Sequence, residues 1–183
     1  MIEPASGILL IADPFLKDPN FLRTVVFLCE HNAEGSFGYV LNRQYQNTLD
    51  QFLPGLDEHK LPVYYGGPVQ QDSIHFLHQY PNEIPGGQEV MKGTYWGGDF
   101  DALVDVIKSP SFNPDKVRLF IGYSGWEAGQ LEEEITEKTW LTVKANNKII
   151  FQKNYDTIWK DSLKLLGGDY EMMANFPTDP QLN

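Results

Sequence analysis

The chain has 183 residues, the length of one ordinary domain, and 42% of them are apolar, enough to bury a substantial core. Its 14 Lys and Arg against 25 Asp and Glu give a net charge of −11, which excludes a protein that binds nucleic acid mainly through a broad basic surface. The single cysteine, Cys29, excludes an internal disulfide and any zinc module built from several cysteines.

The first part of the chain predicts three strands. Residues 7–12 are a continuous apolar run bounded by Gly and Asp-Pro, which is typical of a strand buried on both faces. Residues 24–31 are rich in β-branched and aromatic side chains and predict a second strand. Turn residues at 32–35 lead into residues 37–41, so the second and third strands are expected to form a hairpin.

Short elements follow in the middle of the chain. A capping-box pattern at residues 48–51 predicts a short helix that ends at the Pro-Gly pair of residues 54–55. Residues 63–65 and 74–80 are each expected to form a strand.

A further strand, interrupted at Gly93, is predicted over residues 89–96. Asp99 is expected to cap a helix that runs to Ile107, because the apolar residues of this segment fall at helical spacing. Residues 117–121, Val-Arg-Leu-Phe-Ile, are interpreted as a strand whose side chains alternate between two faces.

The last third of the chain predicts two helices and a hairpin. One helix is expected up to about Thr136, and residues 140–144 and 148–151 are expected to pair across a turn. A final helix is predicted over residues 156–166, where a Gly-Gly pair ends it. Residues 169–183 show no clear period and are expected to form an irregular tail.

These elements predict an α+β fold in a single domain over residues 1–168. Strands outnumber helices, and short turns join many of them, so the β core is expected to be mixed but largely antiparallel and flanked by helices. A barrel-like closure of this core is one of the arrangements that the pattern allows. No linker or internal repeat divides the chain.

The N-terminus has no basic region ahead of an apolar stretch, so we expect no secretory signal. The longest apolar runs have the length of strands and fall far short of the roughly 20 residues that span a membrane. The sequence therefore predicts a cytoplasmic protein without a membrane anchor.

Ser124 has two interpretations. It lies between a predicted strand and a predicted helix, as the serine of a nucleophile elbow does. An elbow has Gly two residues after the serine, where this chain has Trp126, and every His of the chain precedes Ser124. Ser124 with Glu127 also matches a capping box, so we expect Ser124 to cap the helix rather than to act as a nucleophile.

The histidines and the cysteine do not predict a metal site. In a strand, His75 and His78 point to opposite faces, so we expect them to be structural, although one of them could line a site. Cys29 and His31 share a strand face and would form a nucleophilic pair if they opened to a cleft. We expect Cys29 to be a buried small hydrophobe instead.

Glycine pairs such as residues 66–67 lack the Lys and Ser or Thr of a phosphate-binding loop and are interpreted as turns. The three consecutive glutamates at residues 132–134 lie off the apolar stripe of their helix and are interpreted as a solvated face. Together with Glu137 they would suit a protein partner with a basic surface.

Several polar residues stand in segments that are otherwise apolar or rich in turns. If they are buried or face a cleft, they must be hydrogen-bonded to one another or to a ligand. A structural polar network is one interpretation. In the other, they converge at strand ends, and the guanidinium of Arg23 clamps an anion. The candidate binding residues are Asn20, Arg23, His31, Asn42, Gly66, Gly67, Ser124, Trp126 and Gln130.

Blocks of characteristic sequence follow one another in a fixed order over most of the chain. They are residues 7–32, with Glu-His-Asn at their end, residues 38–43, residues 65–70, residues 120–126, and residues 129–132. On these blocks the chain resembles the YqgE/AlgH family of bacterial proteins.

The resemblance implies an α+β domain, a cytosolic location and no established enzymatic activity. One lineage is named as a regulator of alginate synthesis, and the label of transcriptional regulator is sometimes extended to the family. The net charge of −11 and the lack of a helix-turn-helix pattern argue against direct nucleic-acid binding. The family has no agreed catalytic residues, so none is assigned, and no metal or cofactor is expected.

Two functional hypotheses result. The first is a non-catalytic cytosolic regulator or adaptor that acts through a protein partner, because no complete catalytic constellation is visible. The alternative is a small-molecule binder or an unrecognised enzyme with a polar site at the strand ends.

Overall fold

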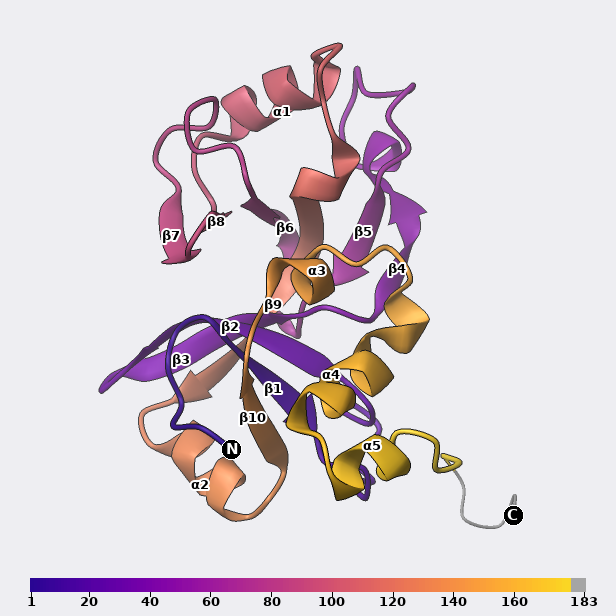
Figure 1. Ribbon diagram of the computed structural model, residues 1–183. Coiled ribbons are helices and arrows are strands. Elements are labelled where there is room, and N and C mark those ends of the chain that lie inside the picture. Colours follow the sequence, from indigo (N-terminus) through magenta and orange to yellow (C-terminus); the bar gives the residue numbers. More distant parts are fainter. Residues whose placement is uncertain (179–183) are drawn as a thin grey trace.

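The computed structural model describes residues 1–178 (Figure 1). The strands are β1 (Ile8–Ala12), β2 (Val25–Asn32), β3 (Gly35–Val40), β4 (Gln44–Thr48), β5 (Pro62–Tyr65), β6 (Val69–His78), β7 (Gln88–Met91), β8 (Thr94–Trp96), β9 (Val117–Glu127) and β10 (Trp140–Lys144). The α-helices are α1 (Phe100–Lys108), α2 (Gln130–Thr136), α3 (Asn147–Ile150), α4 (Ile158–Leu166) and α5 (Asp169–Met173). Short 3-10 helices are η1 (Leu49–Gln51), η2 (Pro114–Lys116) and η3 (Tyr155–Thr157).

Strand β9 belongs to both halves of the sheet. Hydrogen-bonded neighbours follow the order β10-β1-β2-β3-β9-β6-β8-β7, and β5 joins β9 in parallel while pairing with β4 on its other side. The remaining described pairs are antiparallel. This confirms the single-domain α+β fold with a mixed, largely antiparallel core. Over the described residues, β10 and β7 end the order, so the sheet is not closed into a barrel.

The two halves meet where β9 bends at Gly122, whose φ of 70° is in the left-handed region that favours glycine. Ahead of this bend β9 lies between β5 and β6, and beyond it β9 pairs with β3. Gly66, just after β5, donates its N–H to the carbonyl of Ile121 at 2.9 Å. The Gly66 carbonyl accepts the N–H of Val40 at 2.9 Å, so one residue joins β9 to the end of β3.

Backbones touch at this junction without room for side chains. A Cβ atom on Gly66 would lie 2.3 Å from the carbonyl oxygen of Gly122, and one on Gly67 would lie 2.2 Å from the backbone carbonyl of Tyr123. Such distances are far inside van der Waals contact, so only glycine fits at these positions. We call residues 66, 67 and 122 the glycine junction.

Apolar side chains cover both faces of the lower sheet, which consists of β10, β1, β2, β3 and the end of β9 (Figure 1). Every residue of β1 is buried, as its continuous apolar run predicts. One face packs against α3 and α4, where Trp159 donates its indole N–H to the carbonyl of Ala12 at 2.9 Å. The other face packs against α2 through Leu131. The upper half consists of β4 to β8 and the first part of β9, and α1 covers its strands β5, β6 and β9.

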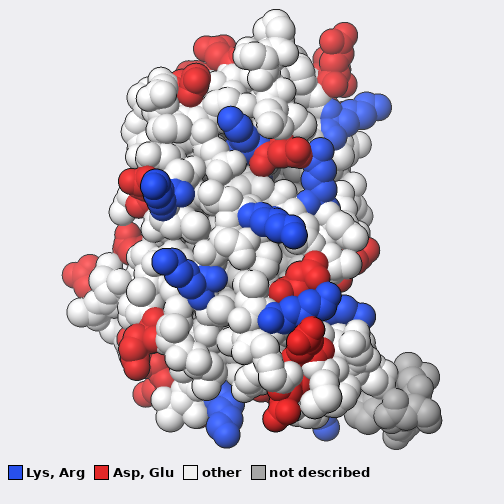
Figure 2. Space-filling model, in the orientation of Figure 1, with Lys and Arg blue, Asp and Glu red and all other residues white. Residues whose placement is uncertain are grey.

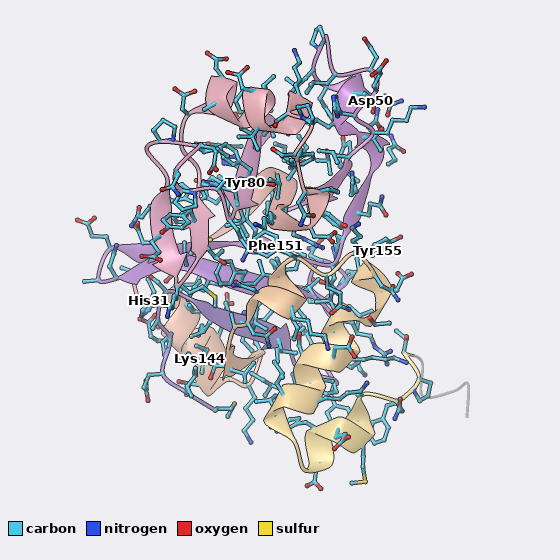
Figure 3. The ribbon with its side chains drawn as sticks, turned by 45° about the horizontal axis from the view of Figure 1, so that its top comes forward. His31, Asp50, Tyr80, Lys144, Phe151 and Tyr155 are labelled. Atoms are coloured by element: carbon cyan, nitrogen blue, oxygen red, sulfur yellow. The ribbon has the colours of Figure 1, made fainter. Side chains whose placement is uncertain are left out.

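Arg118 links segments from both halves and is only 3% exposed. Its guanidinium lies 3.7 Å above the ring of Tyr64 and donates to the backbone carbonyls of Leu41 and Gln152. Burial lowers the pKa of Arg118 to about 10, so the group still carries its charge at neutral pH. Phe151, next to Gln152, and Tyr155 lie at the same boundary (Figure 3).

Most of the predicted elements are confirmed. Asp99 caps α1 by accepting the N–H of Ala102 at 2.9 Å, and the capping box of Thr48 and Gln51 begins η1. The predicted strands over residues 7–12, 24–31, 37–41, 63–65, 74–80 and 117–121 correspond to β1, β2, β3, β5, β6 and the first half of β9, and the predicted helix over residues 156–166 corresponds to η3 and α4.

Ser124 does not cap a helix, so that prediction is wrong. Strand β9 continues to Glu127, and α2 begins only at Gln130, after Gly129. The strand persists because Ser124 pairs with Gly38 of β3 in the ladder. A long-range pairing therefore overrides a local capping signal.

Three other predictions need correction. Residues 147–150 form α3 rather than a strand, because Asn146 caps this turn by accepting the N–H of Ile149 at 3.0 Å. Residues 89–96 form two short paired strands, β7 and β8, rather than one. The predicted irregular tail begins with helix α5, while residues 179–183 lie outside the described residues. Strand β4 is not predicted by the sequence.

Over residues 1–178, no helix combines the length and the apolar composition that crossing a membrane requires.

Replacing glycine by alanine should affect the stability unequally at Gly66 and Gly125, although both have a φ that any residue can adopt. Gly66→Ala should destabilise the fold by about 3–5 kcal/mol, because its Cβ would collide with backbone and a core backbone has little room to relax. Gly125→Ala is the matched control, because its Cβ would meet its nearest atom, in Tyr123, at an ordinary 3.5 Å. Urea unfolding of both variants measures the difference, and equal stabilities would contradict the account of the junction.

Candidate functional site

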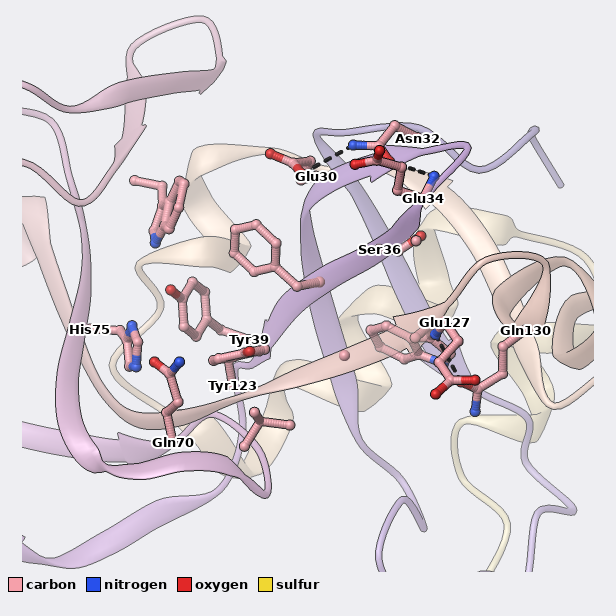
Figure 4. A pocket seen from close by; sticks show the side chains of 16 residues that line it. Glu30, Asn32, Glu34, Ser36, Tyr39, Gln70, His75, Tyr123, Glu127 and Gln130 are labelled. Carbon is pink, nitrogen blue, oxygen red and sulfur yellow. Dashed lines mark hydrogen bonds between the residues drawn. The ribbon is translucent and has the colours of Figure 1, made fainter.

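A cleft of about 1110 Å³ opens where β3, β9 and the start of β6 diverge from the glycine junction. Its floor is one face of the β3–β9 pair, and Trp96 of β8 lies over one end. Figure 4 shows the side chains of His75, Gln70, Tyr39 and Tyr123 gathered at that end, which we call the aromatic end. Glu127 and Gln130 lie at the opposite end.

The hollow has a simple origin in strand geometry. Alternate residues of a strand share a face, so Phe37 and Tyr39 of β3 point into the cleft together with Tyr123 of β9. Gly125 pairs with Phe37 in the ladder, and the next cross-strand pair on this face joins Gly35 to Glu127. Because neither glycine has a side chain, the sheet face is bare beside a row of large aromatic rings.

Carboxylates line the rim of the cleft. Glu30 of β2 accepts a hydrogen bond from Asn32 at 3.1 Å, and Asn32 in turn accepts the N–H of Glu34 at 2.8 Å. Glu127 donates its backbone N–H to Gln130 at 3.0 Å. Neither Lys nor Arg is among the described residues that line the cleft.

This lining differs from the surface that Figure 2 shows, where Lys and Arg are interspersed with Asp and Glu. The net charge of −11 is therefore not spread evenly, because the cleft holds only acidic side chains among its charged residues. Such a local concentration of negative charge attracts a positively charged ligand.

Two buried polar atoms at the aromatic end make no well-formed hydrogen bond to the described residues. They are the hydroxyl oxygen of Tyr39 and Nε2 of His75. Burial raises the pKa of Tyr39, so its hydroxyl stays protonated. Burial also lowers the pKa of His75, although the backbone of Gln70 and the charge of Asp72 oppose this shift, so the imidazole is neutral at pH 7. A neutral imidazole has one nitrogen that can accept a hydrogen bond.

The predicted binding residues do not all meet in this cleft. Only Trp126 and Gln130 are among the residues that line it. His31 is adjacent but points to the other side of the strand, where it contacts Ser36 Oγ at 2.7 Å and Glu132 of α2 at 3.5 Å. Figure 3 labels His31 near the end of the β2–β3 hairpin.

Asn20, Arg23 and Asn42 lie in a separate place. Asn42 bridges the backbone of β2, because its side chain accepts the N–H of Val25 at 2.9 Å and donates to the carbonyl of Arg23 at 2.8 Å. The guanidinium of Arg23 lies 4.6 Å above the ring of Trp159 and donates to the carbonyl of Phe176. Asn20 is exposed in the loop before them.

Gly66, Gly67 and Ser124 belong to the glycine junction and its surroundings. Ser124 is only 2% exposed and donates its hydroxyl to the carbonyl of Gly66 at 3.1 Å. The structure thus brings these three residues together as backbone contacts and a buried hydrogen bond. None of the three is among the residues that line the cleft.

The acidic helix is not simply a solvated face. One carboxylate oxygen of Glu134 accepts the indole N–H groups of both Trp126 and Trp140 at 2.8 Å, and its other oxygen accepts the amide of Gln130 at 3.0 Å. Glu134 therefore anchors α2 to β9 and β10, in contrast to the sequence-based interpretation. Glu133 and Glu137 are exposed, as predicted.

Cys29 is buried, as predicted. Burial raises the pKa of its thiol well above the ordinary value, and the nearby Glu30 carboxylate adds to this shift. The thiol is therefore not activated as a nucleophile. Within residues 1–178, no group of three or more His, Cys, Asp or Glu side chains is placed to hold a metal ion.

Sequence reasoning missed Glu30, Tyr39 and Tyr123 as lining residues. Strand alternation alone places Phe37 and Tyr39 on one face, which is a usable signal. The sequence does not show that β9 is the neighbour of β3 or that β6 brings His75 to the same place. His75 was interpreted as structural, with the reservation that it could line a site, and it does line the cleft.

Comparisons with known proteins give a consistent result. The family model described as AlgH-like matches residues 9–171. A UPF0301 protein of Chlorobium limicola is 42% identical over 177 residues, which cover 97% of this chain and 95% of that protein. A UPF0301 protein of Cytophaga hutchinsonii is 39% identical over 97% of this chain and 98% of its own length.

Two solved structures resemble the fold. The solution structure of the AlgH protein from Pseudomonas aeruginosa superposes with a TM-score of 0.74 and 30% identity, covering 97% of this chain and 98% of that one. A crystal structure of a Corynebacterium diphtheriae protein superposes with a TM-score of 0.79 at 21% identity, covering 96% and 94% of the two chains, and shares the fold.

Proposed function

The chain belongs to the AlgH-like family, and from that premise we propose that it is a non-catalytic cytosolic regulator or adaptor that binds a basic segment of a partner protein in the cleft over the β3–β9 pair. One observation carries this proposal. Among the described residues, the charged side chains that line the cleft are all carboxylates, and they surround an aromatic floor.

The chemistry of the lining suits a cationic segment. Glu30, Glu34 and Glu127 attract positive charge, and aromatic faces bind ammonium and guanidinium groups through their quadrupoles. Nucleic acid would be repelled by the same carboxylates. The partner that complements this cleft is therefore a protein with exposed Lys or Arg.

The size of the cleft favours a segment of chain over a small molecule. Its volume of about 1110 Å³ lies at the upper end of the roughly 300–1,000 Å³ that small-molecule pockets occupy, so there is room for a longer ligand. Its floor extends along the β3–β9 pair from the aromatic end to Gln130, so an extended segment of several residues would lie along it.

The proposal predicts binding that depends on the rim carboxylates. A blocked heptapeptide of alternating Lys and Gly should bind, and replacing Glu30, Glu34 and Glu127 together by Gln should weaken it by roughly tenfold, because each such charge pair contributes about 0.2–1 kcal/mol. Isothermal titration calorimetry at low and moderate salt measures this loss.

The matched control removes the same charge elsewhere. Glu58, Glu133 and Glu137 are exposed and lie outside the residues that line the cleft, so their joint replacement by Gln should change the affinity much less. Equal losses in the two triple variants would mean that only the overall charge matters, and they would contradict binding in the cleft.

A second candidate function, hydrolysis of an ester, has one observation in its favour. The imidazole of His31 contacts a serine hydroxyl on one side and a carboxylate on the other, as in a catalytic triad. The distances are 2.7 Å to Ser36 Oγ and 3.5 Å to the carboxylate of Glu132. It ranks second because 3.5 Å is long for the hydrogen bond that orients a catalytic base. Ser36 lines the cleft, but strand alternation places its side chain on the opposite face of β3 from Phe37 and Tyr39.

Ester hydrolysis is tested directly with p-nitrophenyl acetate. The regulator or adaptor proposal predicts the same low rate for the wild-type protein and for Ser36→Ala. A rate well above that of the buffer, lost in Ser36→Ala and retained in the exposed control Ser111→Ala, would instead establish the second function.

A further inference from the structure

We propose that the aromatic end of the cleft is a subsite for a primary ammonium group, supplied by a lysine side chain of the bound segment. This inference rests on the proposed function and goes beyond it, because it assigns one residue type to one place in the cleft. The residues that form the subsite are Phe37, Tyr39, His75, Trp96 and Tyr123.

The five rings form a connected box. The ring centroid of Phe37 lies 4.7 Å from that of Trp96, 6.1 Å from that of Tyr39 and 5.8 Å from that of Tyr123. The imidazole of His75 closes the box, with 5.7 Å to each of the two tyrosine rings. Boxes of this kind bind cations, because the faces of the rings carry partial negative charge.

Two unsatisfied acceptors lie in the wall of this box. The hydroxyl oxygen of Tyr39 and Nε2 of His75 are buried and make no well-formed hydrogen bond within residues 1–178, although the side chain of Trp96 adjoins the hydroxyl. The ring of Tyr39 is 0% exposed, so its hydroxyl cannot turn to bulk solvent. Buried polar groups are almost always hydrogen-bonded, so an unpartnered pair at the closed end of a cleft indicates an occupant that donates hydrogen bonds.

An ammonium group matches these demands better than the other groups of a polypeptide. It has three N–H donors and no acceptor, so it can bond to both atoms and keep a face against the rings. An apolar side chain would leave both atoms unsatisfied. A carboxylate would be repelled by the rim glutamates. A guanidinium has five N–H donors in a rigid plane, and several of these donors would lack a partner.

The rim places an acidic group beside the entrance. Glu30 of β2 pairs in the ladder with Phe37, which belongs to the box. Glu30 is half-buried and its carboxylate already accepts one hydrogen bond from Asn32. A lysine side chain that enters the box therefore passes a carboxylate on its way, and its backbone stays over the bare floor at Gly125.

The test varies one residue in a peptide whose basic flanks stay constant. The probes are blocked heptapeptides Gly-Arg-Gly-X-Gly-Arg-Gly, where X is lysine, norleucine, acetyl-lysine or arginine. The flanking arginines supply the attraction to the rim, so they test the proposed function, while X tests the subsite. We expect the lysine peptide to bind about tenfold more tightly than the other three.

The variant Tyr39→Phe removes one acceptor of the subsite. Since this hydroxyl makes no well-formed hydrogen bond and only adjoins the side chain of Trp96, its loss should change the stability little. The preference for lysine over norleucine should fall from about tenfold to about threefold or less. Tyr45→Phe, a half-buried tyrosine outside the cleft, should keep the full preference.

The outcomes separate the two proposals. Equal binding of all four peptides, still weakened when the rim glutamates are replaced, would overturn the ammonium subsite and leave the proposed function in place. Tighter binding of the arginine peptide would also overturn it, as would an unchanged lysine preference in Tyr39→Phe. No binding of any peptide would contradict the proposed function itself.

Discussion

The contact between the backbones of Gly66, Gly67 and Gly122 determines how the two halves of this protein are joined. With no Cβ atoms in the way, Gly66 bonds to Ile121 of β9 on one side and to Val40 at the end of β3 on the other. The buried hydroxyl of Ser124 adds a third bond to the same residue. Strand β9 can therefore run on into the lower sheet after its bend, and a single strand holds both halves of the core.

The cleft is a consequence of this junction. Val69, the first residue of β6, still pairs with Tyr123 just past the bend, but residues 70–73 bulge out of the ladder. Strand β9 then continues beyond the start of β6 and pairs with β3, which leaves a sheet face uncovered. Large rings stand at one end of this face and Gly125 leaves its middle bare. Because the described residues of the rim carry only carboxylates as charged groups, the same geometry that joins the halves also produces the acidic cleft to which we assign the binding of a cation.

The sequence predicted the fold better than the site, for identifiable physical reasons. Apolar runs and capping patterns are local, so strands such as β1 and the helix capped by Asp99 could be recognised. Ser124 was misinterpreted because its partner, Gly66, is remote in sequence. The aromatic end joins Tyr39, His75 and Tyr123 from three strands, and only the pairing order reveals that they meet. Asn42 and Arg23 were noted as polar groups in segments that are otherwise apolar or rich in turns, and Asn42 ties β2 to the end of β3.

The most direct measurement of the central claim is an NMR titration of the isotope-labelled protein with a lysine-containing basic peptide. Binding in the cleft predicts that the largest shift changes cluster at Glu30, Gly35, Phe37 and Gly125, with the side-chain signals of His75 and Trp96 among them. The same titration of Gly125→Leu, which fills the bare floor, should show these changes reduced. Shift changes concentrated instead on Glu133 and Glu137 of α2, or spread evenly over the surface, would contradict the account.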